Sequence, residues 1–123
     1  MMKRPLFKIL VLMVLISAWA FPQITLTSPN GGESWNTNSA KTISWSTTYS
    51  GSVNIYLYKA GSLHSTLTTN WTYGNSFSWN ISATLSPGSD YQINIAGSLS
   101  PATNGMSASY FTIALPPLQN SSE

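Results

Sequence analysis

The stretch LSPGSDYQINI, residues 85–95, combines a tight turn with a strand whose two faces differ. After the turn formers Pro87 and Gly88, apolar and polar residues alternate from Tyr91 to Ile95. Alternation with a period of two is typical of a β-strand that buries one face and leaves the other in water. Because turn formers directly precede it, the strand is predicted to begin at a sharp corner.

The same alternation recurs along most of the chain. It occurs at Ile24–Leu26, Ile43–Trp45, Val53–Leu57, Phe77–Ile81 and Phe111–Ile113, with a short edge strand expected at Leu63–Leu67. Turn-forming residues separate these segments, and no segment after residue 20 has convincing helical periodicity. The pattern predicts an all-β fold, an antiparallel sandwich of about seven strands, and the regular apolar spacing argues against disorder. The aromatic residues on the apolar phase are predicted to fill the core: Trp45, Phe77, Trp79 and Phe111.

The place of Tyr91, just after the corner, narrows the fold further. A tyrosine there can return its hydroxyl to the backbone of the corner, as in immunoglobulin-like and fibronectin-III-like sandwiches. The alternative is a simple turn followed by an ordinary core tyrosine. We favour the hydrogen-bonded corner, and with it an immunoglobulin-like sandwich.

Residues 1–20 have the pattern of a signal peptide. Three basic residues lie near the start, an unbroken apolar run follows at Ile9–Ile16, and Ala18 and Ala20 stand where a signal peptidase reads small residues. The run is shorter than the roughly 20 residues of a spanning helix, although a retained signal anchor is the alternative. We therefore predict an N-terminal signal helix at 1–20, the sandwich at 21–114, a flexible tail at 115–123, and an extracellular or cell-surface location.

Removal of the signal changes the charge of the chain. The full sequence has a net charge of +2, but after residue 20 two lysines face three acidic residues, 2 − 3 = −1. Such a surface cannot neutralise a run of phosphates, so nucleic acid is not an expected partner. Polybasic attachment to lipid is not supported, and no stable membrane span is expected after cleavage. The absence of cysteine excludes disulfides, thiolate metal sites and thiol nucleophiles.

Few residues could carry catalysis. The acidic side chains Glu33, Asp90 and Glu123 show no pairing suited to glycoside hydrolysis, and His64 with Asp90 lacks a nucleophile elbow. A calcium site at Glu33 and Asn30 would have a single carboxylate, which is little for a hard cation. The chain is therefore predicted to have no catalytic residue, no metal and no cofactor.

The aromatic residues off the core phase offer a candidate ligand-contact face. Tyr56 and Tyr58 point away from the predicted core, and amide side chains share their phase on strands expected to be neighbours. Aromatic faces with amides suit a sugar ring, which needs apolar stacking and hydrogen bonds to hydroxyls. A protein-contact face is the alternative, and so is an ordinary exposed sheet surface. The candidate residues are Asn54, Tyr56, Tyr58, Gln92 and Asn94, extended by Trp71 and Tyr73 in an expected loop.

Six stretches in this order carry a family resemblance: ITLTSPNGGESW (24–35), KTISWS (41–46), VNIYLYKAG (53–61), FSWNI (77–81), LSPGSDYQINI (85–95) and SYFTI (109–113). Together they resemble the Kre9/Knh1-type domain of the Ser-Thr-rich GPI-anchored membrane protein family. The resemblance implies an extracellular immunoglobulin-like β-sandwich; fungal members are linked to cell-wall β-1,6-glucan assembly, and similar modules occur in prokaryotic surface and secreted proteins. Without a long Ser/Thr stalk or a hydrophobic GPI tail, only fold and compartment are expected to carry over.

The sequence therefore predicts a secreted or cell-surface module that is non-catalytic and acts in binding or structure, in association with the cell envelope or wall, or in adhesion. Its expected partner is a cell-wall or surface glycan, or another envelope protein. The alternative is a protein–protein assembly or spacer module of a surface complex. A glycan-active hydrolase is a minor alternative.

Overall fold

The computed structural model describes residues 21–118. The predicted signal helix at 1–20 and residues 119–123 of the predicted tail lie outside this range. The described residues form nine β-strands and no helix, so this range holds no helix that could cross a membrane. The strands are β1 (Ile24–Ser28), β2 (Ser34–Asn36), β3 (Ser39–Thr47), β4 (Val53–Lys59), β5 (Ser62–Trp71), β6 (Ser76–Ile81), β7 (Gly88–Gly97), β8 (Asn104–Met106) and β9 (Phe111–Ala114).

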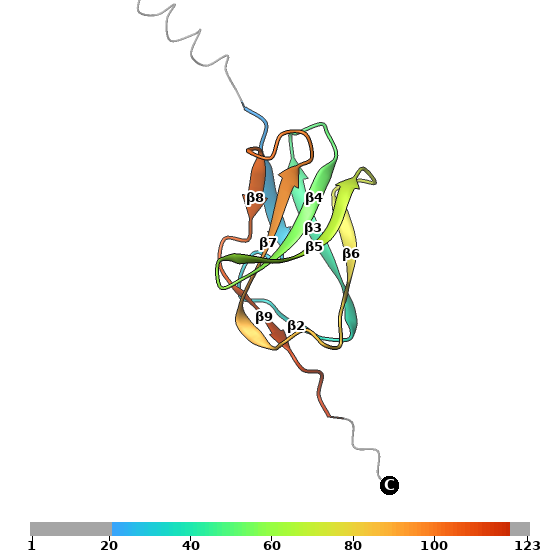
Figure 1. Cartoon of the computed structure of the whole chain (residues 1–123), viewed down its shortest axis with the longest axis vertical. Helices are drawn as coiled ribbons and strands as arrows, with labels where there is room; N and C mark the ends of the chain where they lie inside the picture. Colours follow the sequence, from blue (N-terminus) through green and yellow to red (C-terminus); the bar gives the residue numbers. More distant parts are fainter. Residues whose placement is uncertain (1–20, 119–123) are drawn as a thin grey trace, which may run out of the picture.

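The strands form two sheets that pack face to face (Figure 1). The smaller sheet has the strand order β1-β3-β6, and the larger has the order β2-β9-β7-β4-β5 with β8 paired to β7. Neighbouring strands are antiparallel except β2 and β9, which run parallel. The predicted all-β sandwich is therefore confirmed.

Two short strands account for the difference between about seven predicted strands and the nine observed. β2 (SWN) and β8 (NGM) each contain a single large apolar residue, so neither shows apolar residues on alternate positions. β5 is also longer than the predicted edge strand, because it pairs with β4 from Lys59 back to Val53. The turn before it uses Ala60 and Gly61 at positive φ angles of 52° and 82°, a conformation that suits tight hairpins.

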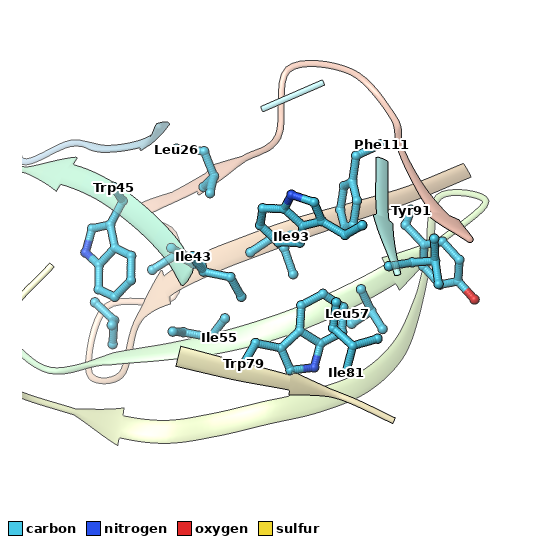
Figure 2. Close-up of a cluster of buried hydrophobic side chains, with 14 of the residues drawn as sticks. Leu26, Ile43, Trp45, Ile55, Leu57, Trp79, Ile81, Tyr91, Ile93 and Phe111 are labelled. Atoms are coloured by element: carbon cyan, nitrogen blue, oxygen red, sulfur yellow. The ribbon is translucent and has the colours of Figure 1, made fainter. Parts of the chain in front are cut away.

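The core lies between the two sheets and holds the aromatic residues predicted for it (Figure 2). Trp45, Trp79 and Phe111 are 4%, 6% and 1% exposed, while Phe77 is partly buried at the margin of the core. Trp35 on β2 adds a further indole, with its ring centroid 5.6 Å from that of Phe111. Each such buried side chain contributes roughly 1.5–3 kcal/mol to folding, so the alternating residues supply most of the driving force.

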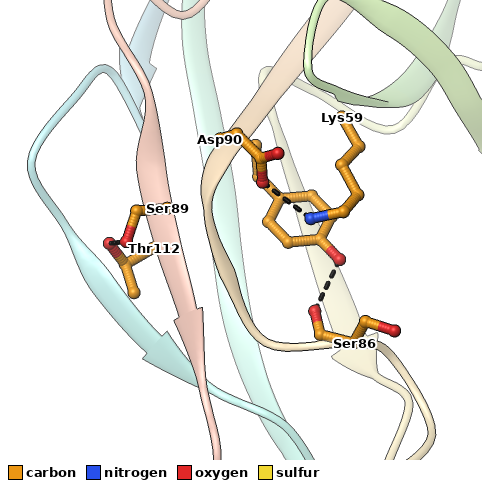
Figure 3. A network of polar contacts seen from close by, with 6 residues as sticks. Lys59, Ser86, Ser89, Asp90 and Thr112 are labelled. Atoms are coloured by element: carbon orange, nitrogen blue, oxygen red, sulfur yellow. Dashed lines mark hydrogen bonds and ion pairs between the residues drawn. The ribbon is translucent and has the colours of Figure 1, made fainter.

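The corner before β7 has the geometry predicted for it (Figure 3). The Tyr91 hydroxyl donates a hydrogen bond of 2.6 Å to the carbonyl oxygen of Ser86, and the Tyr91 side chain is fully buried. The Lys59 ammonium lies 4.3 Å from the centre of the Tyr91 ring and 2.7 Å from an oxygen of Asp90. The hydrogen-bonded tyrosine corner is therefore confirmed, and an ion pair covers it.

Candidate ligand-contact face

Five of the seven candidate residues lie together on the outer side of the larger sheet. On β4 the residues between Val53 and Leu57 that face the core are buried, so the alternate positions face outward. In the pairing of β4 with β7, Tyr56 lies opposite Asn94 and Tyr58 lies opposite Gln92. Residues directly opposite each other in a sheet share a face. We call this set, Asn54, Tyr56, Tyr58, Gln92 and Asn94, the tyrosine face.

Hydrogen bonds to neighbouring segments hold Asn54 in place. Its side-chain oxygen accepts hydrogen bonds from the Asn70 amide and the Ser98 hydroxyl, both at 2.9 Å. Its nitrogen donates to the Tyr56 hydroxyl at 3.1 Å. Asn54 therefore joins the β5 end and the loop after β7 to the first tyrosine of the face, and it fixes the direction of that hydroxyl.

The two amides on β7 are held in the same way. The Asn94 nitrogen donates to the Asn104 side-chain oxygen at 3.0 Å, and the Gln92 nitrogen donates to the Ser107 carbonyl at 3.0 Å. Asn94 is 8% exposed, so it supports the face more than it presents atoms to a ligand. The tyrosine face is thus a preorganised surface, in which fixed amides surround two partly exposed rings.

A hollow of about 380 Å³ lies over the tyrosine face. Ala96 and Gly97 of β7 belong to its lining, and Leu63 from β5, Pro101 from the loop after β7 and Asn104 from β8 complete it around the two tyrosines. No residue of the lining carries a charge. The sequence could not have assigned these three residues to the face, because their placement depends on how β5 and β8 pair with β4 and β7.

Trp71 and Tyr73 lie elsewhere in the structure. Trp71 ends β5 and pairs with Val53, which places its side chain on the core side of the sheet. The Trp71 ring contacts Phe77 and Tyr73 edge to face, with centroids 5.0 Å and 5.1 Å apart. Its ring nitrogen donates to the Ser76 carbonyl at 3.1 Å. The structure therefore places Trp71 and Tyr73 in a separate aromatic cluster at one end of the sandwich.

The Glu33 carboxylate is engaged within its own turn. Its two oxygens accept hydrogen bonds from the backbone amides of Asn30 and Gly31 at 2.9 Å and 2.8 Å. Partial burial acts to raise the pKa of the Glu33 carboxyl, but hydrogen bonds from backbone amides outweigh it and hold the pKa below its usual 4.5. The Asn30 side-chain oxygen accepts from the Ala108 amide at 2.8 Å. The oxygens considered for calcium thus stabilise the turn.

The remaining polar candidates, Asp90 and His64, each have a different hydrogen-bond partner. Asp90 pairs with Lys59, and the hydrogen bond that Asp90 accepts raises the pKa of the Lys59 ammonium above 10.5. His64 is exposed, and its ring nitrogen Nδ1 lies 3.3 Å from the Ser65 hydroxyl. Within residues 21–118, no three His, Asp or Glu side chains lie close enough to hold a metal ion. Among residues 21–118, Asp90 is engaged by Lys59 and no hydrogen bond joins it to His64, so the predicted lack of a Ser-His-Asp arrangement is consistent with the contacts observed.

The family comparison agrees with the fold. The family model for the Kre9/KNH-like N-terminal Ig-like domain matches residues 28–113. No curated protein matches the chain. Among solved structures, the chain is similar to a CARDB domain of a Pyrococcus furiosus protein in complex with di-metal ions, with 13% identity over 76% of this chain and 88% of that one and a TM-score of 0.42. The family match spans most of the sandwich, and this chain belongs to the Kre9/KNH-like N-terminal Ig-like domain family.

Proposed function

We propose that this chain is an exported, non-catalytic module that binds an uncharged glycan of the cell envelope through its tyrosine face. Membership of the Kre9/KNH-like family indicates a cell-surface or wall-associated module of immunoglobulin-like fold. Glycan binding is the more specific step, and it rests on the geometry of the outer surface of the larger sheet.

The observation that carries the proposal is the pair of tyrosines on alternate residues of β4. Tyr56 and Tyr58 share one face, with Cα atoms about 7 Å apart in an extended strand. Their rings are partly exposed and border the same hollow. Two neighbouring sugar rings could stack on such a pair, while their hydroxyls form hydrogen bonds with tyrosine hydroxyls and the remaining amide atoms.

The chemistry of the hollow favours neutral sugars. Its lining contains Asn, Tyr, Leu, Ala, Gly and Pro residues and no charged side chain. The carboxylate of an acidic sugar would lose hydrating water on binding and would gain no cationic partner, so its desolvation would weaken binding. A neutral hexose polymer loses only hydroxyl hydration, and the amides around the hollow can replace it.

A glycan array followed by calorimetry tests the proposal. We expect the intact protein to bind at least one neutral wall polysaccharide, and Tyr56→Ala/Tyr58→Ala to bind it at least tenfold more weakly, about 1.4 kcal/mol. Tyr73→Ala is the matched control, because Tyr73 is 79% exposed but lies in the other aromatic cluster. Absence of binding by the intact protein, or equal binding by the double variant, would remove the glycan proposal.

A second candidate function is the assembly of surface proteins. β5 is an edge strand that pairs only with β4 among the described strands, and Leu63 at its start is 57% exposed beside the hollow. Unpaired edges of this kind can accept a strand from another chain. Light scattering after size exclusion, with a pull-down from the native envelope, tests this role; a strict monomer without a recovered partner contradicts it.

The hydrolase alternative has a direct test. Hydrolysis of a wall polysaccharide by the intact protein that is lost in His64→Ala or Asp90→Asn would support it. We expect no such activity, because Asp90 is paired with Lys59 and His64 is exposed on β5.

A further inference from the structure

Four segments far apart in the sequence meet at one end of the sandwich, which we call the loop end. They are residues 21–23, 48–52, 71–75 and 98–103. The Thr48 amide donates to the Gln23 carbonyl, the Ser98 amide donates to the Ser52 carbonyl, and Trp71 pairs with Val53. In Figure 1 the described chain begins at this end, and the loop before β8 and the loop between β5 and β6 lie there too.

The loop end contains no Asp, Glu, Lys or Arg residue. Residues 21–118 contain four charged side chains, Glu33, Lys41, Lys59 and Asp90, and each lies in the part of the sandwich toward the Tyr91 corner. Lys59 lies opposite Tyr91 on β7 and pairs with Asp90. Lys41 lies opposite Trp79, near the end of β6 that leads to the corner. The protein is therefore divided into a charged end and an uncharged end.

Large apolar side chains project from the loop end. Phe21, Tyr73 and Leu99 are 77%, 79% and 92% exposed, and they come from three different segments. Trp71 and Tyr49 pack behind them against the core. A soluble surface usually scatters such residues singly among charges. Here the other residues of the four segments are mostly small or polar, and none is charged. Exposure of the three apolar side chains to water does not stabilise the fold, whereas their transfer to an apolar phase would be favourable.

We propose that the loop end rests on the surface of a lipid bilayer, with Phe21, Tyr73 and Leu99 inserted among the headgroups. The sequence supplies the reason for this partner. Residues 1–20, with their apolar run, directly precede Phe21. While that segment occupies the membrane, during export or as a retained anchor, Phe21 is held at the bilayer surface and the loops beside it face the lipid.

The side chains at the loop end suit that environment. Tyrosine and tryptophan are enriched at membrane–water interfaces, where an apolar ring and a polar group are both satisfied, and Tyr73 fits this environment. Phe21 and Leu99 add apolar area that insertion would remove from water. Without lysine or arginine, the contact depends on apolar insertion, so its strength should not depend on anionic lipid or on salt. The loop at 98–103 borders both surfaces, because Pro101 lines the hollow over the tyrosine face. Phe21, Tyr73 and Leu99 do not line that hollow, so lipid contact through them and glycan binding can be tested separately.

Vesicle flotation tests the inference without the signal segment, with a chain that begins at Phe21 and has an acetylated N-terminus, so that no terminal ammonium adds a charge to the loop end. This chain retains the whole core, because every buried core residue lies between Ile24 and Ile113. The probe is neutral phosphatidylcholine vesicles at millimolar lipid, at about 0.1 M and about 1 M salt. We expect measurable binding that is equal at both salt concentrations, and at least a tenfold loss of partitioning for Phe21→Ser/Leu99→Ser.

The matched control is Leu63→Ser/Leu115→Ser, which removes two apolar side chains, 57% and 64% exposed, outside the loop end. We expect this variant to bind vesicles as the parent chain does, and both variants to retain the parent melting temperature. Failure of the parent chain to bind, an equal loss in the control, or binding confined to anionic vesicles at low salt would each overturn the inference. Loss of glycan binding in Tyr56→Ala/Tyr58→Ala with unchanged flotation would show that the two surfaces act separately.

Discussion

Replacement of Tyr91 by phenylalanine tests the physical account of the corner. Tyr91→Phe keeps the buried ring in place and removes only the hydroxyl that donates to the Ser86 carbonyl at 2.6 Å. An intramolecular hydrogen bond contributes roughly 0.5–1.5 kcal/mol net. Ser86 is exposed, so its carbonyl can bind water in the variant and adds little to the loss. We therefore expect the free energy of unfolding to fall by about 1 kcal/mol.

Urea unfolding followed by tryptophan fluorescence measures this change. For a domain of this size the loss corresponds to a fall of about 4–8 °C in the melting temperature, with an unchanged dependence on urea. Tyr58→Phe is the matched control, because it removes a hydroxyl from the partly exposed outer face of the neighbouring strand. Its free energy of unfolding should change by no more than about 0.5 kcal/mol.

Two results would refute the reasoning about the corner. Equal stabilities of Tyr91→Phe and the parent chain would mean that the hydrogen bond to Ser86 contributes nothing. A loss above about 3 kcal/mol would mean that removal of the hydroxyl leaves the Ser86 carbonyl buried and without a hydrogen-bond partner. Tyr91→Ala serves as a reference variant, because loss of the ring creates a cavity and should lower the free energy of unfolding by about 3–5 kcal/mol.

Three further outcomes follow from the structure. Gly105→Ala should destabilise the protein by at least about 2 kcal/mol in urea unfolding, because its Cβ atom would overlap the carbonyl oxygen of Ile24. The folded-state pKa of Glu33 is lowered, so its contribution to stability is complete above pH 4.5 and is lost as the pH falls through the folded pKa. In Glu33→Gln the free energy of unfolding should therefore fall less steeply as the solution is acidified, and an unchanged fall would contradict this. The folded-state pKa of Lys59 is raised, so its contribution persists below 10.5 and is lost as the pH rises through the folded pKa. Lys59→Met should lower stability by roughly 0.5–1 kcal/mol at pH 7, less at high salt, and equal losses at both salt concentrations would argue against the ion pair with Asp90.

The strands that the sequence predicted are those with at least two large apolar residues on alternate positions. β4 and β7 have seven and ten residues, and their apolar phases identify Ile55 and Ile93 as core and Tyr56 as outward. β2 and β8 have three residues each and are defined by pairing with distant strands. Local pattern carries no information about such pairing, because the partner is far away in the sequence.

The candidate site divides in the same way. The phase of β4 placed Tyr56 and Tyr58 on one outer surface, and the pairing with β7 brought Asn94 beside them. Trp71 was expected in a loop near this surface, but the length and register of β5 turn its ring to the core side. Bulges in the pairing of β4 with β5 change which residues share a face, and the sequence pattern does not reveal them.

The sequence by itself determined which residues face the core and where the chain turns, because side-chain direction in a strand alternates with a period of two and Pro and Gly restrict or free the backbone locally. The tertiary structure alone decided which loops meet at one end, which side chains complete the hollow over Tyr56 and Tyr58, and that Lys59 covers Tyr91. These arrangements depend on strand register across two sheets. Register is set by the fit of the whole core, so no single stretch of sequence contains it.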